Sequence, residues 1–246
     1  MSDLLELRHV DKRYGGLHVT RKVSFRLAAG DRLALIGPNG AGKTTLIHQI
    51  SGVVPSDSGE VWLRGENVSR LSQAKRVRHG LARTFQITTL APHLPVQRQI
   101  EMALFEREGL SGSAWRSVDS YPPVSAEAQE LLRRFGLAAH AATATQDLAY
   151  GEQRLIEMAL AMALRPKVLL LDEPMAGVPK GDGAKLLSAL DALPQDLGVL
   201  IIEHDMDLVF RFANRILVLC EGAVLAEGTP EDIRRDPKVR AAYLGN

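Results

Sequence analysis

The sequence predicts an α/β fold with a mostly parallel sheet, and two observations support this prediction. Short runs of consecutive apolar residues, typical of strands covered on both faces, alternate with segments of helical period. One of these runs leads directly into a glycine-rich turn and then a helix pattern, as in a strand–loop–helix unit. The apolar runs are LALIG at 33–37, VLLLD at 168–172, VLIIE at 199–203 and RILVL at 215–219.

Further strands are expected near both ends of the chain. VTRKVSFRL places Val23, Phe25 and Leu27 on one face, which is the period of a half-buried strand. EVWLRGENV is interpreted as a strand and a turn. After RILVL the chain continues through Glu221 and Gly222 into AVLAEG, which predicts a hairpin-like return.

The middle of the chain is expected to be helical. QRQIEMALFER and SAEAQELLRRFGL both have helical period, the second with Ser125 as N-cap and Gly136 as C-cap. The segment between them, 108–125, is rich in Ser, Gly and Pro and predicts a surface loop. We therefore expect a single domain, 1–246, with an α/β core at 1–88 and 161–246 and an inserted helical subdomain at 89–160.

Composition excludes several functional classes. Thirty basic and 29 acidic residues leave a net charge of +1, which argues against nucleic acid as the partner. No stretch approaches 18 apolar residues and the N-terminus has no apolar signal core, so we expect a cytoplasmic protein whose membrane role comes through partners. The single cysteine, Cys220, lies in an apolar run and is expected to be buried and inert.

The segment GPNGAGKTT follows the apolar strand LALI and fits the phosphate-loop pattern G-x-x-x-x-G-K-[ST]. Its glycines let backbone N–H groups turn inward toward an anion, and the following helix N-terminus adds positive partial charge. Lys43 is expected to reach the β- and γ-phosphates, and the Thr44 hydroxyl to hold Mg²⁺. The predicted nucleotide-binding residues are Gly37, Pro38, Asn39, Gly40, Ala41, Gly42, Lys43, Thr44 and Thr45.

Three further residues stand at the carboxyl ends of predicted strands. Asp172 ends VLLLD, where a Mg²⁺-holding carboxylate is required, and Glu173 follows as a candidate general base. His204 follows the next strand, at the edge where open α/β sheets bind ligands. The other six histidines, His48 among them, are interpreted as ordinary.

The segment LAYGEQR at 148–154 opens a predicted buried helix. Together with the motifs above, it makes the chain resemble, over its whole length, the nucleotide-binding subunits of ATP-binding cassette (ABC) transporters. In that family a turn usually written L-S-G-G-Q, the signature, faces the ATP held by the phosphate loop of a second subunit. The resemblance implies a P-loop NTPase fold with an N-terminal antiparallel β-subdomain, and a head-to-tail dimer. It also implies that the signature residues Ala149, Tyr150, Gly151 and Glu152 act on the partner's ATP.

Other roles follow from the same resemblance. Tyr14 matches the aromatic residue that stacks on adenine, and Gln86 in RTFQ matches the glutamine that contacts Mg²⁺ and the attacking water. Asp172, Glu173 and His204 match the metal-binding aspartate, the catalytic glutamate and the switch histidine. The expected cofactors are ATP and Mg²⁺, the expected catalytic residues are Glu173, His204, Gln86 and Lys43, and the expected metal ligands are Thr44, Gln86 and Asp172.

Four segments, RTFQ, AYG, IIEHDMDLV and VRAAYLG, are similar to the ATPases of branched-chain amino-acid importers, and the last also to the lipopolysaccharide-export ATPase. Departures from the family are Ala149 for serine, Glu152 for glutamine, Leu160 for a common arginine, and Pro179 where a polar residue crosses the dimer interface. The basic stretch 74–83 is interpreted as a solvated helix face, with contact to membrane subunits or anionic headgroups as the alternative.

The resemblance implies an ATPase at the cytoplasmic face of the inner membrane that powers import through two permease subunits. It would work as a homodimer or with a paralogous ATPase, and indirectly with an extracytoplasmic substrate-binding protein. The alternatives are a lipid-export ATPase, a soluble ABC ATPase outside transport, and a degenerate regulatory module.

Overall fold

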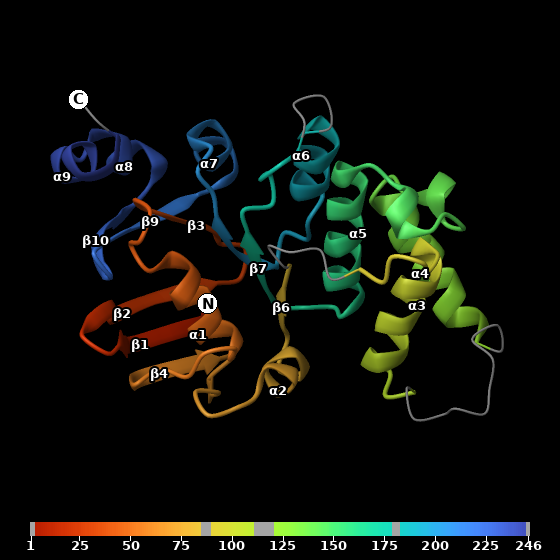
Figure 1. Ribbon diagram of the computed structural model, residues 1–246, viewed down its shortest axis with the longest axis horizontal. Coiled ribbons are helices and arrows are strands. Elements are labelled where there is room, and N and C mark those ends of the chain that lie inside the picture. The colour runs from red at the N-terminus through yellow and green to blue at the C-terminus, as the bar shows by residue number, and fades with distance from the viewer. Residues whose placement is uncertain (1–2, 85–89, 111–120, 179–182, 245–246) are drawn as a thin grey trace. The chain divides into compact units, whose positions relative to one another are not determined.

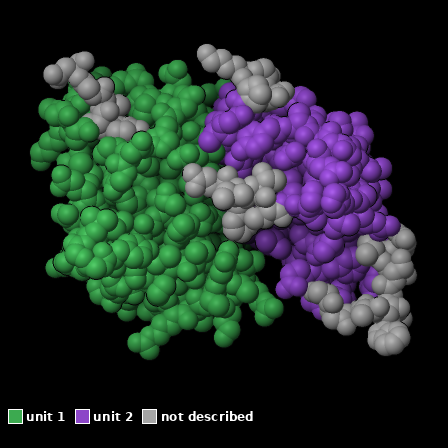
Figure 2. All heavy atoms as spheres, viewed as in Figure 1, with its two compact units in different colours: residues 1–83, 167–173, 194–246 green, residues 84–166, 174–193 purple. Residues whose placement is uncertain are grey.

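The computed structural model describes residues 3–84, 90–110, 121–178 and 183–244 and divides them into two compact units. Unit 1 comprises residues 1–83, 167–173 and 194–246, and unit 2 comprises residues 84–166 and 174–193 (Figure 2). None of the helices in the described residues is long and apolar enough to cross a membrane.

A four-stranded antiparallel sheet of order β2-β1-β4-β5 forms one layer of unit 1 (Figure 1). The predicted face of Val23, Phe25 and Leu27 is buried, as the alternating pattern requires. Pairing between β1 and β2 shifts register at several points, and His9 and Lys22 have positive φ there. The strands are β1 (Asp3–Tyr14), β2 (Leu17–Ala28), β4 (Ser58–Leu63) and β5 (Glu66–Asn67).

The second sheet of unit 1 has six strands in the order β10-β9-β3-β8-β7-β6, and all neighbours are parallel except the hairpin β9–β10. The predicted mostly parallel core sheet and the return through Glu221 and Gly222 are thereby confirmed. Cys220 at the end of β9 is half-buried rather than buried, because the strand leaves the core at this hairpin. The strands are β3 (Arg32–Ile36), β6 (Leu81–Arg83), β7 (Val168–Asp172), β8 (Gly198–Ile202), β9 (Arg215–Cys220) and β10 (Ala223–Gly228).

Helix α1 (Lys43–Ser51) shares one hydrophobic core with both sheets of unit 1. Leu46, Ile47 and Ile50 of α1 belong to the same cluster of buried residues as the inner faces of β1, β2 and β4 and alternate residues of β3, β7, β8 and β9. The remaining helices of unit 1 are α2 (Gln73–Arg78), α7 (Met206–Phe212), α8 (Pro230–Arg235) and α9 (Pro237–Val239), with a π turn at Arg240–Leu244. Thr229 is the N-cap of helix α8, and Pro230 is the first residue of the helix.

Unit 2 is helical. Helix α3 packs against α4, and α5 packs against α3, α4 and α6. The predicted start of α4 at Ser125 is wrong, because the helix begins at Pro122. Proline is tolerated in the first turn, since the backbone N–H that it lacks would have no partner within the helix. Pro122–Ser125, expected in the loop, therefore form its first turn. The helices are α3 (Val96–Arg107), α4 (Pro122–Arg134), α5 (Tyr150–Ala163) and α6 (Gly183–Asp191), with 3₁₀ turns at Ala138–His140 and Thr145–Asp147.

Candidate functional site

The phosphate loop connects the buried end of β3 to the first turn of α1. Gly37, Gly40 and Gly42 all have positive φ, at 148°, 78° and 99°. Gly42 is the N-cap of α1 in the left-handed region, and no acidic side chain stands in the first turn of the helix. The backbone N–H groups and the positive end of the helix dipole are therefore not neutralised locally, as an anion site requires.

Backbone of three other segments presses against this loop. A Cβ on Gly37 would lie 2.0 Å from the Leu219 carbonyl oxygen, and one on Gly42 would lie 2.3 Å from that of Val19. The Gly222 N–H donates to the Ala41 carbonyl at 3.0 Å. Sequence reasoning identified the hairpin turn at Gly222 but not that the turn supports the phosphate loop.

Lys43 lies at the start of α1 with its side chain folded onto the loop. Its Nζ donates to the carbonyl oxygens of Gly37 at 2.7 Å and Pro38 at 3.1 Å, and the residue is 7% exposed. Burial lowers the pKa of Lys43, while the carboxylates of Glu173 and Asp172 oppose that shift. The ammonium therefore stands among loop carbonyls and two acids, all of which favour its charge.

Asp172 ends β7 and is 1% exposed. Its Oδ2 accepts from Arg83 Nη2 at 2.8 Å, and Arg83 ends the neighbouring strand β6. Asp172 Oδ1 is buried and has no hydrogen-bond partner among the described residues. His48 on α1 is half-buried nearby, and its pKa is lowered by burial first and by the charge of Arg83 second, against the effect of Asp172.

Glu173 and His204 come together after β7 and β8, which pair in parallel. Glu173 has φ of 50°, and its backbone N–H donates to the Ile202 carbonyl at 2.9 Å. This turn carries the side chain away from the strand, so that Glu173 Oε1 lies 3.0 Å from His204 Nε2. Both side chains are partly exposed, at 23% and 42%, so water has access to the pair.

Tyr14 ends β1 at the tight hairpin to β2, and 49% of the residue is exposed. The ammonium of Lys12 lies 5.4 Å from the centroid of its ring, and Lys12 is also paired with Asp57 at 2.6 Å. An exposed aromatic ring at a loop tip is available for stacking.

In unit 2 the segment 149–152 forms the start of α5. Ala149 is the N-cap and supplies no side-chain acceptor, while Glu152 Oε2 accepts from the Ala149 N–H at 3.2 Å. Glu152 also lies 3.2 Å from His140 Nε2 and 3.9 Å from Lys185 Nζ. Glu152 therefore caps its own helix and lies close to one imidazole, that of His140, and one ammonium, that of Lys185.

Tyr150 connects the start of α5 to the loop that follows Pro174. Its hydroxyl accepts from Arg154, whose guanidinium carbon lies 4.9 Å from the ring centroid and which pairs with Glu157 at 2.8 Å. A Cβ on Gly177 would lie 3.2 Å from the Tyr150 ring. The ring thus packs against the loop segment 174–178 within unit 2.

Gln86 and Pro179 lie outside the described residues. Of the other predicted residues, Lys43, Asp172, Glu173 and His204 meet at one edge of the parallel sheet in unit 1, whereas Ala149–Glu152 belong to unit 2. Within the described residues, no group of three or more His, Cys, Asp and Glu side chains is arranged to hold a metal ion.

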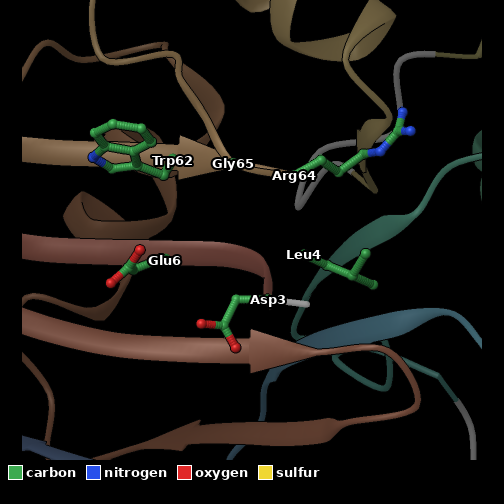
Figure 3. A pocket seen from close by; sticks show the side chains of 6 residues that line it. All are labelled: Asp3, Leu4, Glu6, Trp62, Arg64 and Gly65. Atoms are coloured by element: carbon green, nitrogen blue, oxygen red, sulfur yellow. The ribbon is translucent and has the colours of Figure 1, made fainter. Parts of the chain in front are cut away.

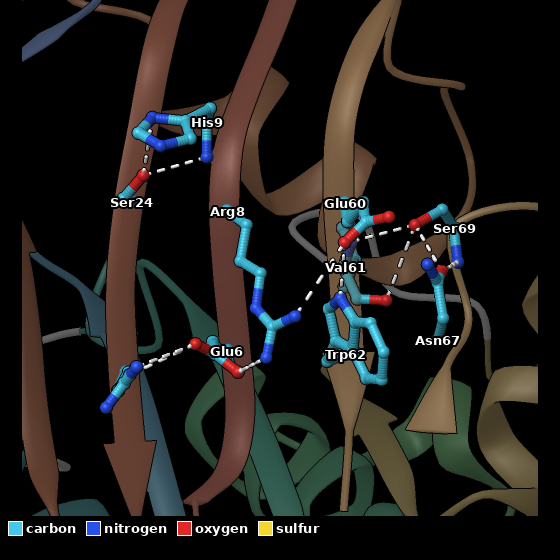
Figure 4. Close-up of polar contacts among 10 residues, drawn as sticks. Glu6, Arg8, His9, Ser24, Glu60, Val61, Trp62, Asn67 and Ser69 are labelled. Carbon is cyan, nitrogen blue, oxygen red and sulfur yellow. Dashed lines mark hydrogen bonds and ion pairs between the residues drawn. The ribbon is translucent and has the colours of Figure 1, made fainter. Parts of the chain in front are cut away.

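The antiparallel sheet carries a separate hollow of about 370 Å³ (Figure 3). Glu6 and Trp62, which line it, alternate along their strands with buried residues and so point away from the core. Beside it, Arg8 lies 2.7 Å from Glu6, 3.9 Å from Glu60 and 4.3 Å from the Trp62 ring (Figure 4). The hydrogen bond from Arg8, two residues along the same strand, lowers the pKa of Glu6. The contacts of Arg8 with Glu60 and Trp62 connect β1 to the neighbouring strand β4.

Comparisons with known proteins agree with this geometry. Residues 20–176 match the family described as ABC transporter, and residues 223–246 match the one described as branched-chain amino acid ATP-binding cassette transporter. The chain is 37% identical to the high-affinity branched-chain amino acid transport ATP-binding protein LivG of Salmonella typhimurium, with 98% of each chain covered. It is 33% identical to the lipopolysaccharide export system ATP-binding protein LptB of Acidithiobacillus ferridurans, covering 100% of this chain and 98% of LptB.

A solved structure, the ADP conformation of an ATP-binding cassette of an ABC transporter, has a TM-score of 0.85 at 26% identity, with 100% of both chains covered. The predicted P-loop fold with an antiparallel subdomain and helical insertion is therefore confirmed. Because the family match spans most of the chain and the relatives align over nearly all of it, the chain belongs to the ATP-binding ATPases of ABC transporters.

Proposed function

We propose that this chain binds MgATP in the phosphate loop and hydrolyses it in a head-to-tail dimer, powering import through two permease subunits. One observation carries the proposal: Lys43, Asp172, Glu173 and His204 meet at the carboxyl edge of the neighbouring strands β3, β8 and β7. This is the edge at which open α/β sheets bind ligands.

The residues present fit a nucleotide-bound Mg²⁺. Magnesium in such sites needs few protein ligands, because phosphates and water supply the others. The buried Asp172 Oδ1 has no partner among the described residues, and the exposed Thr44 stands at the start of α1. Asp172 and Thr44 would hold the ion, which when bound would neutralise charge on the phosphates.

Glu173 is proposed as the general base. Its carboxylate would accept the proton of a water whose oxygen bonds to the γ-phosphorus as the bond to the β–γ bridging oxygen breaks, giving ADP and phosphate. His204, 3.0 Å away, would hold that carboxylate in place. Lys43 would leave the loop carbonyls for the phosphates, and Gln86 is proposed to contact the attacking water.

The dimer is proposed because the chain contains one phosphate loop and one signature. The start of α5, with Ala149 and Gly151, would approach ATP bound by a second subunit, where a helix N-terminus favours the γ-phosphate. The partner is a second copy or a paralogous ATPase. The inserted helical subdomain expected at 89–160 is proposed to dock on the permeases, which would hold the chain at the cytoplasmic face of the inner membrane.

Branched-chain or related amino acids are the proposed cargo, delivered by an extracytoplasmic binding protein. The match of residues 223–246 and the similarity to LivG support this choice. Lipid export is the second candidate, and the full-length similarity to LptB is the observation in its favour.

The test uses Glu173→Gln with Glu231→Gln on the exposed first turn of α8 as the control. Loss of the base should lower kcat about 10²–10⁴-fold while ATP binding persists, and light scattering should show an ATP-dependent dimer. Hydrolysis at the wild-type rate would remove Glu173 from the mechanism, and a monomer in ATP would argue against the dimer.

Affinity purification of the tagged variant from detergent-solubilised native membranes with ATP identifies the partners. Recovery of two multi-spanning permeases and a sister ATPase supports import. Recovery of a lipid-export complex favours the second candidate, and recovery of ribosomal or DNA-associated proteins alone would rule out transport.

A further inference from the structure

Arg83, which is not among the expected site residues, forms a buried ion pair with Asp172 at the proposed metal site. The side chains are 8% and 1% exposed, and one bond of 2.8 Å joins Arg83 Nη2 to Asp172 Oδ2. Arg83 is the last residue of β6, which pairs in parallel with β7, so two adjacent strand ends carry the pair. Burying a carboxylate this completely is unfavourable unless a positive charge lies beside it.

The contact distinguishes the two oxygens of Asp172. Oδ2 is occupied by the guanidinium, whereas Oδ1 is buried and has no hydrogen-bond partner within the described part of the chain. A guanidinium that covered the carboxylate would engage both oxygens in a fork. The single contact instead holds one oxygen and leaves the other available.

We propose that Arg83 is a positioning residue for the metal-binding carboxylate: it fixes Asp172 through Oδ2 and leaves Oδ1 for the divalent cation that accompanies the nucleotide. The inference rests on the proposed function, since it assumes that the phosphate loop binds a metal–nucleotide complex. Hydrogen-bond partners of ligating carboxylates orient them and influence metal affinity strongly.

The probe is Mn²⁺ with ADP, and the readout is free Mn²⁺ measured by electron paramagnetic resonance, with no turnover involved. Arg83→Gln removes the charge and cannot span the same distance, whereas Arg83→Lys keeps a positive donor. The matched control is Arg215→Gln, which removes an arginine–aspartate pair, with Asp31 at 3.0 Å, at the amino end of β9. Binding of ADP alone is measured in excess EDTA.

Arg83→Gln should raise the Kd for Mn²⁺ in the presence of ADP about 10- to 100-fold. Arg83→Lys should show a smaller rise, and Arg215→Gln none. Binding of ADP in EDTA should stay within about twofold of wild type for all variants, because the phosphate loop is untouched.

An unchanged or lower Kd for Mn²⁺ in Arg83→Gln would overturn the inference, since it would make Arg83 a neutral bystander or a competitor of the metal. An equal loss in Arg215→Gln would overturn it too, by assigning the effect to general destabilisation. Failure of the wild-type chain to bind ADP in EDTA would be a different result: the proposed function would fail, and the inference with it.

Discussion

Replacing Gly222 by alanine tests whether the β9–β10 turn positions the phosphate loop. Gly222 has φ of 80°, and an added Cβ would lie 2.5 Å from the Val19 carbonyl oxygen and 2.9 Å from its carbon. Both are backbone atoms, so neither can rotate away. The turn must shift, and the hydrogen bond from Gly222 N–H to the Ala41 carbonyl shifts with it.

Gly65→Ala provides the matched control. Gly65 sits in the β4–β5 turn with φ of 82°, and a Cβ there meets nothing within 4 Å. Both variants share a left-handed backbone cost of about 1–2 kcal/mol. Gly222→Ala adds an overlap cost of about 1–3 kcal/mol, so its total should reach about 2–5 kcal/mol.

The assay measures the free energy of unfolding in urea and the affinity for a fluorescent ADP analogue for both variants. Loss of one net hydrogen bond to the loop, worth about 0.5–1.5 kcal/mol, corresponds to a loss of affinity of about two- to tenfold. Gly65→Ala should bind the analogue as wild type does. Equal affinities in the two alanine variants would refute the idea that the hairpin supports the loop.

Two further predictions concern stability. Because the folded state lowers the pKa of His48, the unfolded chain binds more protons near pH 6.5, and stability should fall as the pH drops through 6.5 toward the folded pKa. His48→Gln should flatten the dependence of the urea midpoint between about pH 7.5 and 5.5; an unchanged slope would contradict this reasoning. In unit 2, Glu127 accepts from Arg107 through both oxygens at 2.7 Å and from Arg165 at 3.1 Å. Glu127→Gln should lower the free energy of unfolding by about 1–3 kcal/mol, measured by urea denaturation against Glu130→Gln, whose pair with Arg133 is exposed; equal effects of both variants would count against it.

The parallel sheet was predictable because its strands are continuous apolar runs, so VLLLD corresponds to β7 residue for residue. β1 was not predicted, although Leu5, Leu7 and Val10 mark a buried face, because charged residues between them dominate the local composition. A register shift also breaks the two-residue period after Leu7. The first turn of α4 was missed because Pro122 and Pro123 indicate a loop to any local rule.

At the candidate site, local sequence patterns predict the residues of the phosphate loop and of the strand ends. They do not predict the residues that hold these in place. Arg83 meets Asp172 across 89 positions of sequence, and Gly222 supports Ala41 from the far end of the chain. Such contacts depend on strand order, which the sequence alone does not reveal. The role of Glu152 as a cap was missed for another reason, since its usual N-cap partner is replaced by Ala149.

The chain passes between the two units at four peptide bonds, and two of them adjoin the chemistry. Arg83 is the last residue of unit 1 before 84, and Glu173 is the last before Pro174. Glu173 also holds a left-handed backbone, a conformation that non-glycine residues adopt rarely. A change in the backbone torsions at either junction would therefore act directly on the proposed base or on the proposed partner of the metal-binding carboxylate.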